Sequence, residues 1–308
     1  MRRLTTLLVL CGALSASAQQ PKSPPPPPFL PPPEGAPRTP ALERLVEGRG
    51  DIVRVVTGYD SLDGIAWRAA DGLTFSDPAT HQIVTWLPSS KTEPVTRVDG
   101  SAPAGLASDA QGGLLVAERN TLRVTRRDKG LVATLVDRVD GEPLRGPSEV
   151  TVAPNADVYV ADFGSGGGRV IRVTAAGQAS VVVSDVAQPA GLGVSPAGTV
   201  LYVADSARSE LRAYPIDPRG GVGTGRRLTP ITPWKSGVNG RPAGLLVDRA
   251  GHIFLAGPGG VWVLDENGGR LGVIAMPERP SACTLGDIDG RTLYIAAETS
   301  IYKVRLRK

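Results

Sequence analysis

The chain has 308 residues, and its 34 Lys and Arg residues only slightly outnumber its 30 Asp and Glu residues. Hydrophobic residues make up 41% of the sequence, which is enough to bury a sizeable core and excludes a wholly disordered chain. The basic residues are scattered without a run of five or six, so no nucleic-acid partner is expected. The 38 Gly and 28 Pro residues favour many short strands joined by turns over long helices.

Residues 1–18 have the three-part pattern of a secretory signal peptide. A basic start is followed by an apolar run over residues 4–14 and by small residues that end at Ala18. Because this run is too short to span a membrane, no transmembrane helix is expected here. We expect cleavage after Ala18 and a periplasmic or secreted protein. Cys11 does not indicate a lipoprotein, since the residue before a lipidated Cys is normally small and here it is Leu10.

A proline-rich linker over residues 19–41 follows the signal peptide. Of the 22 residues from 19 to 40, 11 are Pro, which predicts an extended polyproline II spacer of roughly 3 Å per residue. A folded domain is expected from residue 42 to residue 308. Its only cysteine is Cys283, so the mature chain is expected to contain no intrachain disulfide.

Six short apolar strands recur along this domain at intervals of 40 to 52 residues. They cover residues 73–77, 114–118, 158–162, 201–205, 253–257 and 293–297. A turn and a first strand precede each of them, and an alternating third strand follows. Three to four strands in each of six repeats predict an all-β, six-bladed β-propeller. The last repeat ends after its third strand, and we expect a strand at residues 52–56 to complete it and close the ring.

Several polar residues of the repeats are expected to have structural roles. Asp162 and Asp205 end second strands, where carboxylates usually accept hydrogen bonds from turn amides. His81 and His252 lie in turn-like segments and are expected to be solvated. Cys283 lies on an inner strand and is expected to be a small buried hydrophobic residue.

The order, spacing and end residues of the repeats resemble the family of gluconolactonase and regucalcin (senescence marker protein). The resemblance covers nearly the whole domain and is carried by segments such as GLASDAQGGLLVAERNTLRVTRRD (105–128) and GPSEVTVAPNADVYVADF (146–163). It implies a six-bladed propeller that hydrolyses lactones or related esters. It also implies one divalent cation at the top of the central channel, held by a Glu, two Asn and an Asp.

The first inward residue of each inner strand lies beside the propeller axis, so the resemblance can be followed position by position. The residues at the four ligand positions are, in chain order, Asp63, Ser148, Ala190 and Ala243, and the other two axis positions hold Ala104 and Ser281. Asp63 and Ser148 are therefore candidate ligands of one calcium, zinc or manganese ion. They form a weak cage, because Ca²⁺ takes six to eight oxygens. Glu149 is expected to point to the opposite face of its strand from Ser148.

Two functions follow from these residues. The first is an exported lactone hydrolase, in which a cation anchored by Asp63, with Ser148 and waters, polarises the carbonyl and activates water. The second is a non-catalytic propeller whose channel mouth binds an anionic small molecule or a protein partner, with Arg145 and Arg241 as contacts. The sequence assigns no catalytic residue, and we expect a monomer.

Overall fold

The computed structural model describes residues 33–48, 51–88, 94–98 and 101–307. The expected signal peptide, its cleavage point, Cys11 and most of the proline-rich linker lie outside these residues. Within the described part of the chain, no helix is long and apolar enough to cross a membrane.

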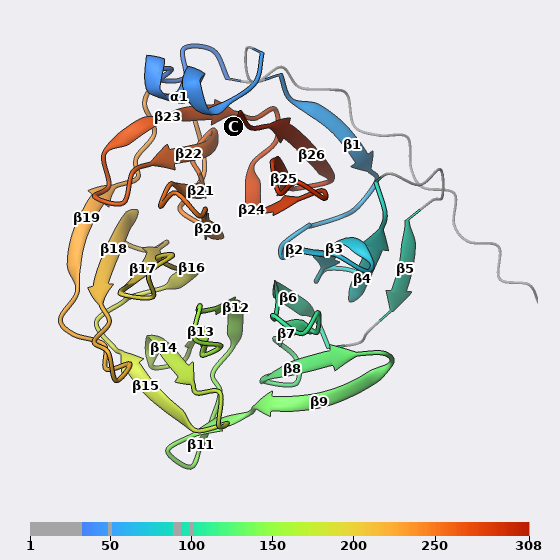
Figure 1. The fold of residues 1–308 in the computed structure, drawn as a ribbon, viewed down its shortest axis with the longest axis vertical. Coiled ribbons are helices and arrows are strands. Elements are labelled where there is room, and N and C mark those ends of the chain that lie inside the picture. The colour runs from blue at the N-terminus through green and yellow to red at the C-terminus, as the bar shows by residue number, and fades with distance from the viewer. Residues whose placement is uncertain (1–32, 49–50, 89–93, 99–100, 308) are drawn as a thin grey trace, which may run out of the picture.

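Six four-stranded antiparallel sheets surround a central opening, which confirms the predicted six-bladed β-propeller (Figure 1). Blade 1 contains β2 (Ile65–Arg68), β3 (Gly72–Asp77), β4 (Gln82–Trp86) and β5 (Val95–Val98), and blade 2 contains β6 (Pro103–Ser108), β7 (Leu114–Glu118), β8 (Arg123–Asp128) and β9 (Leu131–Val136). Blade 3 contains β12 (Pro147–Val152), β13 (Val158–Gly164), β14 (Gly167–Val173) and β15 (Ala179–Val183), and blade 4 contains β16 (Pro189–Val194), β17 (Val200–Asp205), β18 (Glu210–Pro215) and β19 (Arg226–Pro230). Blade 5 contains β20 (Leu245–Val247), β21 (Ile253–Gly257), β22 (Gly260–Leu264) and β23 (Arg270–Ala275), and blade 6 contains β24 (Pro280–Gly286), β25 (Thr292–Ala297), β26 (Ser300–Arg305) and β1 (Val53–Thr57). A short hairpin of β10 (Arg138–Val139) and β11 (Glu142–Pro143) joins blades 2 and 3.

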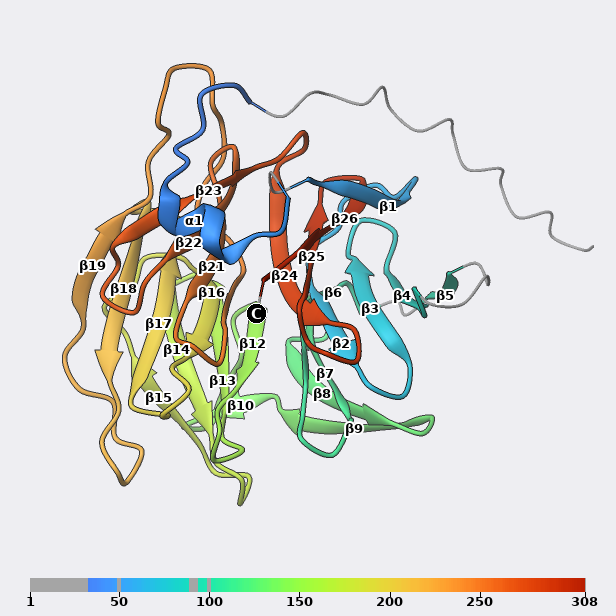
Figure 2. The same ribbon diagram turned by 45° about the horizontal axis from the view of Figure 1, so that its top comes forward.

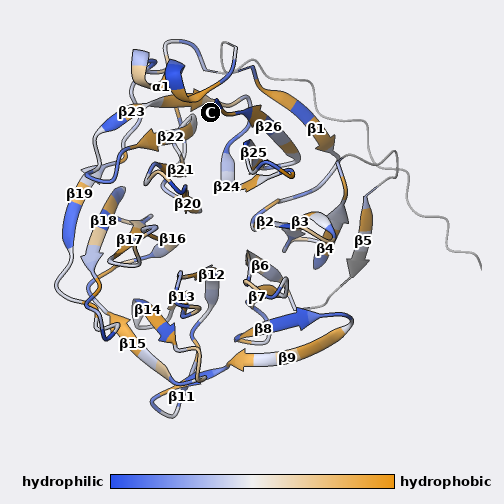
Figure 3. Ribbon diagram, viewed as in Figure 1, coloured by the Kyte–Doolittle hydropathy of each residue, from blue (hydrophilic) through white to orange (hydrophobic). Residues whose placement is uncertain are grey.

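The hydrophobic core is divided among the interfaces between blades. Six clusters of buried apolar side chains each join residues of two neighbouring blades, so every blade packs on both of its faces. The second strands are therefore largely buried, and the side chains of β7 and β25 are buried along their whole length. The outermost strand of blade 4, β19, is largely hydrophilic (Figure 3).

The N-terminal strand closes the ring as expected. β1 pairs with β26 in antiparallel register, with Val53 opposite Lys303 and Thr57 opposite Ser300. Ahead of β1, the helix α1 (Pro40–Leu45) packs against β23 on the outside of blade 5, as Figure 2 shows. The two ends of the described chain are thus both bound to the last two blades.

Four blades carry a fully buried carboxylate at the end of the second strand, namely Asp77, Glu118, Asp162 and Asp205. One oxygen of Asp162 accepts the backbone N–H groups of Arg145 and Gly146, each at 2.8 Å. Asp205 accepts the backbone N–H of Ala187 at 2.7 Å in the same way. The structural role predicted for Asp162 and Asp205 is confirmed, and it consists in holding the segment that leads into the inner strand.

Glu118 differs from the other three in that all of its hydrogen-bond donors among the described residues are side chains. They are Thr121, Arg123, Thr125 and Arg127, at 2.5 to 2.7 Å. Burial disfavours the charge of Glu118, but these hydrogen bonds outweigh burial and hold its pKa below the usual value. A depressed pKa means that the ionised carboxylate stabilises the fold above the unfolded-state pKa.

We expect the Glu118→Gln substitution to lower the free energy of unfolding at pH 7 by about 2 kcal/mol, because it leaves the half-buried guanidinium groups of Arg123 and Arg127 without their buried counter-charge. This difference should shrink as the pH falls below about 4, where the wild-type carboxylate becomes protonated as well. Urea unfolding of both proteins at several pH values measures it. A difference that stays constant down to pH 3 would contradict a role for the charge.

Candidate functional site

A cavity of about 760 Å³ lies at the end of the ring where the chain enters the inner strands. Five of the six predicted axis residues line it: Asp63, Ser148, Ala190, Ala243 and Ser281. The sixth, Ala104, is fully buried, and its carbonyl accepts a hydrogen bond from Ser76 Oγ at 2.6 Å. The spacing of the repeats therefore places these residues at one end of the channel, which we call the mouth cavity.

A second cavity, of about 270 Å³, continues along the inner strands and is here called the channel cavity. It is lined by the next residues of the same strands, among them Glu149, Val150 and Cys283. Apart from Glu149, its lining residues are uncharged. The cavity at the mouth is thus the larger of the two, and it holds the arginines that the channel cavity lacks.

The carboxylate of Asp63 is paired with an arginine of the next blade. Arg119 follows directly after β7, and its Nη2 lies 2.8 Å from Asp63 Oδ2. The side chain of Asp63 is 28% exposed and that of Arg119 is 44% exposed, so the pair is reachable from the mouth cavity. Burial raises the pKa of Asp63, and the charge and hydrogen bond of Arg119 oppose that rise. Asp63 therefore sits in a partly desolvated position with a guanidinium as its partner.

Four arginines from four blades line the mouth cavity. The sequence predicted two of them, Arg145 and Arg241, and missed Arg119 and Arg279. A signal was present for Arg279, which directly precedes Pro280 at the start of an inner strand just as Arg241 directly precedes Pro242. For Arg119 no comparable signal exists, because its pairing with Asp63 joins residues from two blades.

Glu149 and Ser148 lie on opposite sides of their strand, as predicted. Ser148 Oγ is 3.4 Å from the carbonyl of Pro189 in blade 4, whereas Glu149 Oε1 lies beside Gly105 of blade 2. The sequence did not predict that Glu149 lines the channel cavity, with 8% of its surface exposed, or that its Oε1 accepts the N–H of Val150 at 2.9 Å. Burial raises its pKa to about 8, and the nearby charge of Asp63 adds to this. The channel cavity therefore favours the protonated form of Glu149.

The mouth residues do not provide the donor set that a divalent cation requires. Asp63 already has Arg119 as its cationic partner, and Ser148 Oγ is directed at two backbone carbonyls, each 3.4 Å away. Ala190 and Ala243 contribute no side-chain oxygen. Among the described residues, no three His, Cys, Asp or Glu side chains gather closely enough to hold a metal ion. One paired carboxylate and one hydroxyl do not fit a calcium cage.

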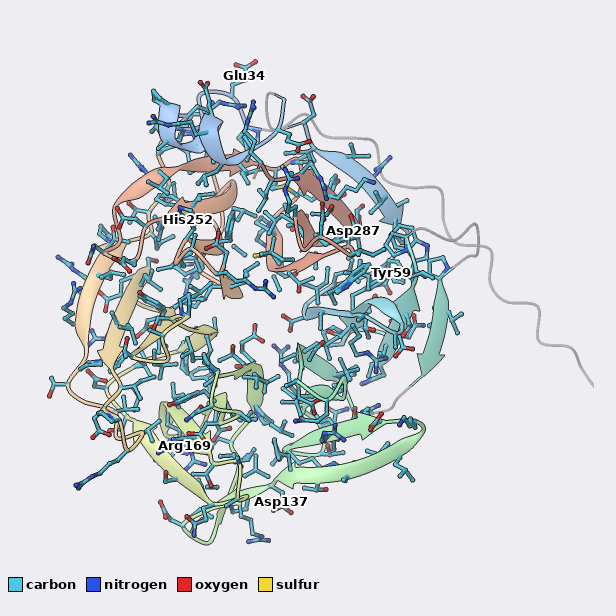
Figure 4. The ribbon with its side chains drawn as sticks, in the orientation of Figure 1. Glu34, Tyr59, Asp137, Arg169, His252 and Asp287 are labelled. Carbon is cyan, nitrogen blue, oxygen red and sulfur yellow. The ribbon has the colours of Figure 1, made fainter. Side chains whose placement is uncertain are left out.

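The remaining candidates lie outside the mouth cavity. Cys283 is 6% exposed, its thiol donates to the carbonyl of Phe254, and burial raises its pKa, so it is an inert buried thiol. His252 lies in a turn of blade 5, with Nδ1 2.9 Å from Asp248 Oδ2 (Figure 4). His81 lies in the turn between β3 and β4. Neither histidine lines the mouth cavity.

Comparison with known proteins gives a consistent result. Residues 62–299 match the model of the SMP-30/Gluconolactonase/LRE-like region. The chain is 25% identical over 304 aligned positions to a gluconolactonase of Zymomonas mobilis subsp. mobilis, covering 87% of this chain and 85% of that one. It is 37% identical over 134 positions to a 6-deoxy-6-sulfogluconolactonase of Pseudomonas putida, covering 42% and 45%.

The fold has solved counterparts as well. The structure of XC5397 from Xanthomonas campestris, described as a gluconolactonase important in glucose secondary metabolic pathways, superposes with a TM-score of 0.80 at 25% identity. The superposition covers 92% of this chain and 99% of that one. Because the family model extends over most of the propeller, the chain belongs to the SMP-30/gluconolactonase/LRE-like family.

Proposed function

We propose that this protein hydrolyses the ring ester of a sugar-type lactone in the mouth cavity. The observation that carries the proposal is the Asp63–Arg119 pair, which places an accessible carboxylate and a guanidinium 2.8 Å apart beside the axis. The named activities of the gluconolactonase relatives support this reaction class. The volume of the mouth cavity, about 760 Å³, leaves room for a sugar ring and an attacking water.

Each member of the pair has a role in ester hydrolysis. Water adds to the carbonyl carbon, the bond from that carbon to the ring oxygen breaks, and the product is a hydroxy acid. Asp63 accepts the proton of the attacking water as general base. The Arg119 guanidinium orients Asp63 and stabilises the negative charge that develops on the carbonyl oxygen. The proton held by Asp63 is then returned to the departing ring oxygen.

We expect Asp63→Asn to lower kcat/KM for D-glucono-1,5-lactone by about 10²- to 10⁴-fold, the usual contribution of a general base. Spectrophotometric detection of the released acid measures the rate. Asp140→Asn is the matched control, because Asp140 is an exposed turn residue in the hairpin of β10 and β11 and its positive φ of 54° suits Asn. Wild-type protein that hydrolyses no lactone but binds the ring-opened acid would instead favour the non-catalytic propeller.

Cation dependence is a separate matter, because the family resemblance implies a metal that the described donors do not fit. We propose no step that passes through a cation. We expect the rate of lactone hydrolysis to be unchanged after treatment with a chelator and after addition of calcium, zinc or manganese. Loss of the activity on chelation and its recovery with one of these ions would restore Asp63 and Ser148 as cation ligands.

We also propose that the protein is exported. The support is the pattern of residues 1–18 in the sequence. Mass spectrometry of the protein from the periplasm or the culture medium should find an N-terminus at Gln19. A chain that keeps residues 1–18 and stays in the cytoplasm would contradict export.

A further inference from the structure

The mouth cavity is strongly asymmetric in charge. Its charged lining residues are one carboxylate, Asp63, and four guanidinium groups, those of Arg119, Arg145, Arg241 and Arg279. All four arginines are exposed at the rim. The channel cavity, by contrast, has no arginine among its lining residues. Positive charge is therefore concentrated at the end of the channel that holds the proposed reactive pair.

Two of these arginines are not paired with a carboxylate of any residue that the structure describes. Arg145 donates from Nη1 to the carbonyl of Gly166 at 3.0 Å, a contact that orients the side chain and leaves its charge uncompensated. Arg241 forms no hydrogen bond or ion pair with the described residues. Arg119 is paired with Asp63, and Arg279 forms a longer pair of 3.5 Å with the exposed Glu298.

The unpaired donors define the chemistry of a ligand. A guanidinium presents several N–H groups in a plane, which matches the oxygens of a carboxylate, phosphate or sulfonate. Arg145 precedes β12 in blade 3, and Arg241 precedes β20 in blade 5. Both line the mouth cavity, but from other blades than Asp63 in blade 1 and Arg119 in blade 2. A ligand that reaches both groups therefore needs an anionic end and a reactive end.

We propose that the substrate is a lactone that carries an anionic group, and that Arg145 and Arg241 bind this group while the ring ester lies at Asp63 and Arg119. The inference rests on the proposed lactone hydrolysis and adds the class of substrate. The anionic group is defined by its chemistry, two or more oxygens that share a negative charge, and carboxylate, phosphate and sulfonate all meet that definition.

The test compares two lactones that differ only in the group at carbon 6, D-glucono-1,5-lactone and its 6-phosphate. We expect wild-type kcat/KM to favour the phosphorylated lactone by about 100-fold, since two charge-assisted contacts contribute about tenfold each. Arg241→Gln should reduce this ratio about tenfold, and the Arg145→Gln, Arg241→Gln double variant should reduce it to near unity. Raising the ionic strength should also lower the wild-type ratio.

Arg249→Gln is the matched control. Arg249 is an exposed arginine of the same blade as Arg241, but it lies in the turn at the other end of β20. Its removal changes the net charge by the same amount and should leave the ratio as it is in the wild type. Circular dichroism checks that the variants are folded, and exposed Arg241 can be replaced without breaking an internal contact.

The outcomes separate the two proposals. Equal kcat/KM for the two lactones, or a preference that survives in the double variant, would overturn the anionic substrate while leaving lactone hydrolysis intact. If neither lactone is hydrolysed, calorimetric binding of D-glucose 6-phosphate and uncharged D-glucose decides whether the mouth cavity binds the anionic group. Tighter binding of D-glucose 6-phosphate that Arg241→Gln abolishes would support the arginine site, and equal or absent binding would overturn it. Measuring kcat/KM for lactones with a carboxylate or a sulfonate at carbon 6 then shows which of the three anionic groups the site prefers.

Discussion

The mouth of this propeller is positioned by buried carboxylates at the ends of the second strands. A charged group that is fully buried is tolerated only when hydrogen bonds satisfy it. Asp162 accepts the N–H groups of Arg145 and Gly146 and also pairs with Arg169, so the carboxylate that satisfies the blade also fixes the backbone of a mouth arginine. Glu118, which directly precedes the mouth residue Arg119, is held by four side chains of its own blade. Stability of the blades and geometry of the site thus depend on the same contacts.

A second constraint is the close approach of the inner strands around the axis. In four blades the residue after the axis position is Gly, at 64, 105, 191 and 244, and a Cβ there would lie 2.1 to 2.8 Å from atoms of the next blade. Blade 3 has Glu149 instead, whose carboxylate extends over Gly105 of blade 2; a Cβ on Gly105 would lie 2.5 Å from Glu149 Oε1. Because Gly105 of blade 2 has no side chain, the carboxylate of Glu149 from blade 3 has room beside it.

These constraints explain how far the sequence could predict the molecule. The repeat of short apolar strands was sufficient for the fold and for the closing strand, because both depend on hydrophobic periodicity within a few residues. It also placed Asp63, Ser148 and three further axis residues at one cavity. The place of Glu149 in the channel cavity was not foreseen, because it depends on the space that Gly105 of the neighbouring blade leaves for the carboxylate. The Asp63–Arg119 pair was missed because it joins side chains 56 positions apart in two blades.

The same segments that lack the family's expected cation ligands also carry the arginines. Ala243 occupies the position where the resemblance implies an Asp, and Arg241 lies two residues before it. Ser148 stands in place of an Asn, with Arg145 three residues before it. In blade 5 the resemblance implies a carboxylate where this chain has the uncharged Ala243, and the guanidinium of Arg241 lies beside it. With four guanidinium groups and one paired carboxylate, the mouth cavity has a positive field, which disfavours a cation and supports the proposed anionic ligand.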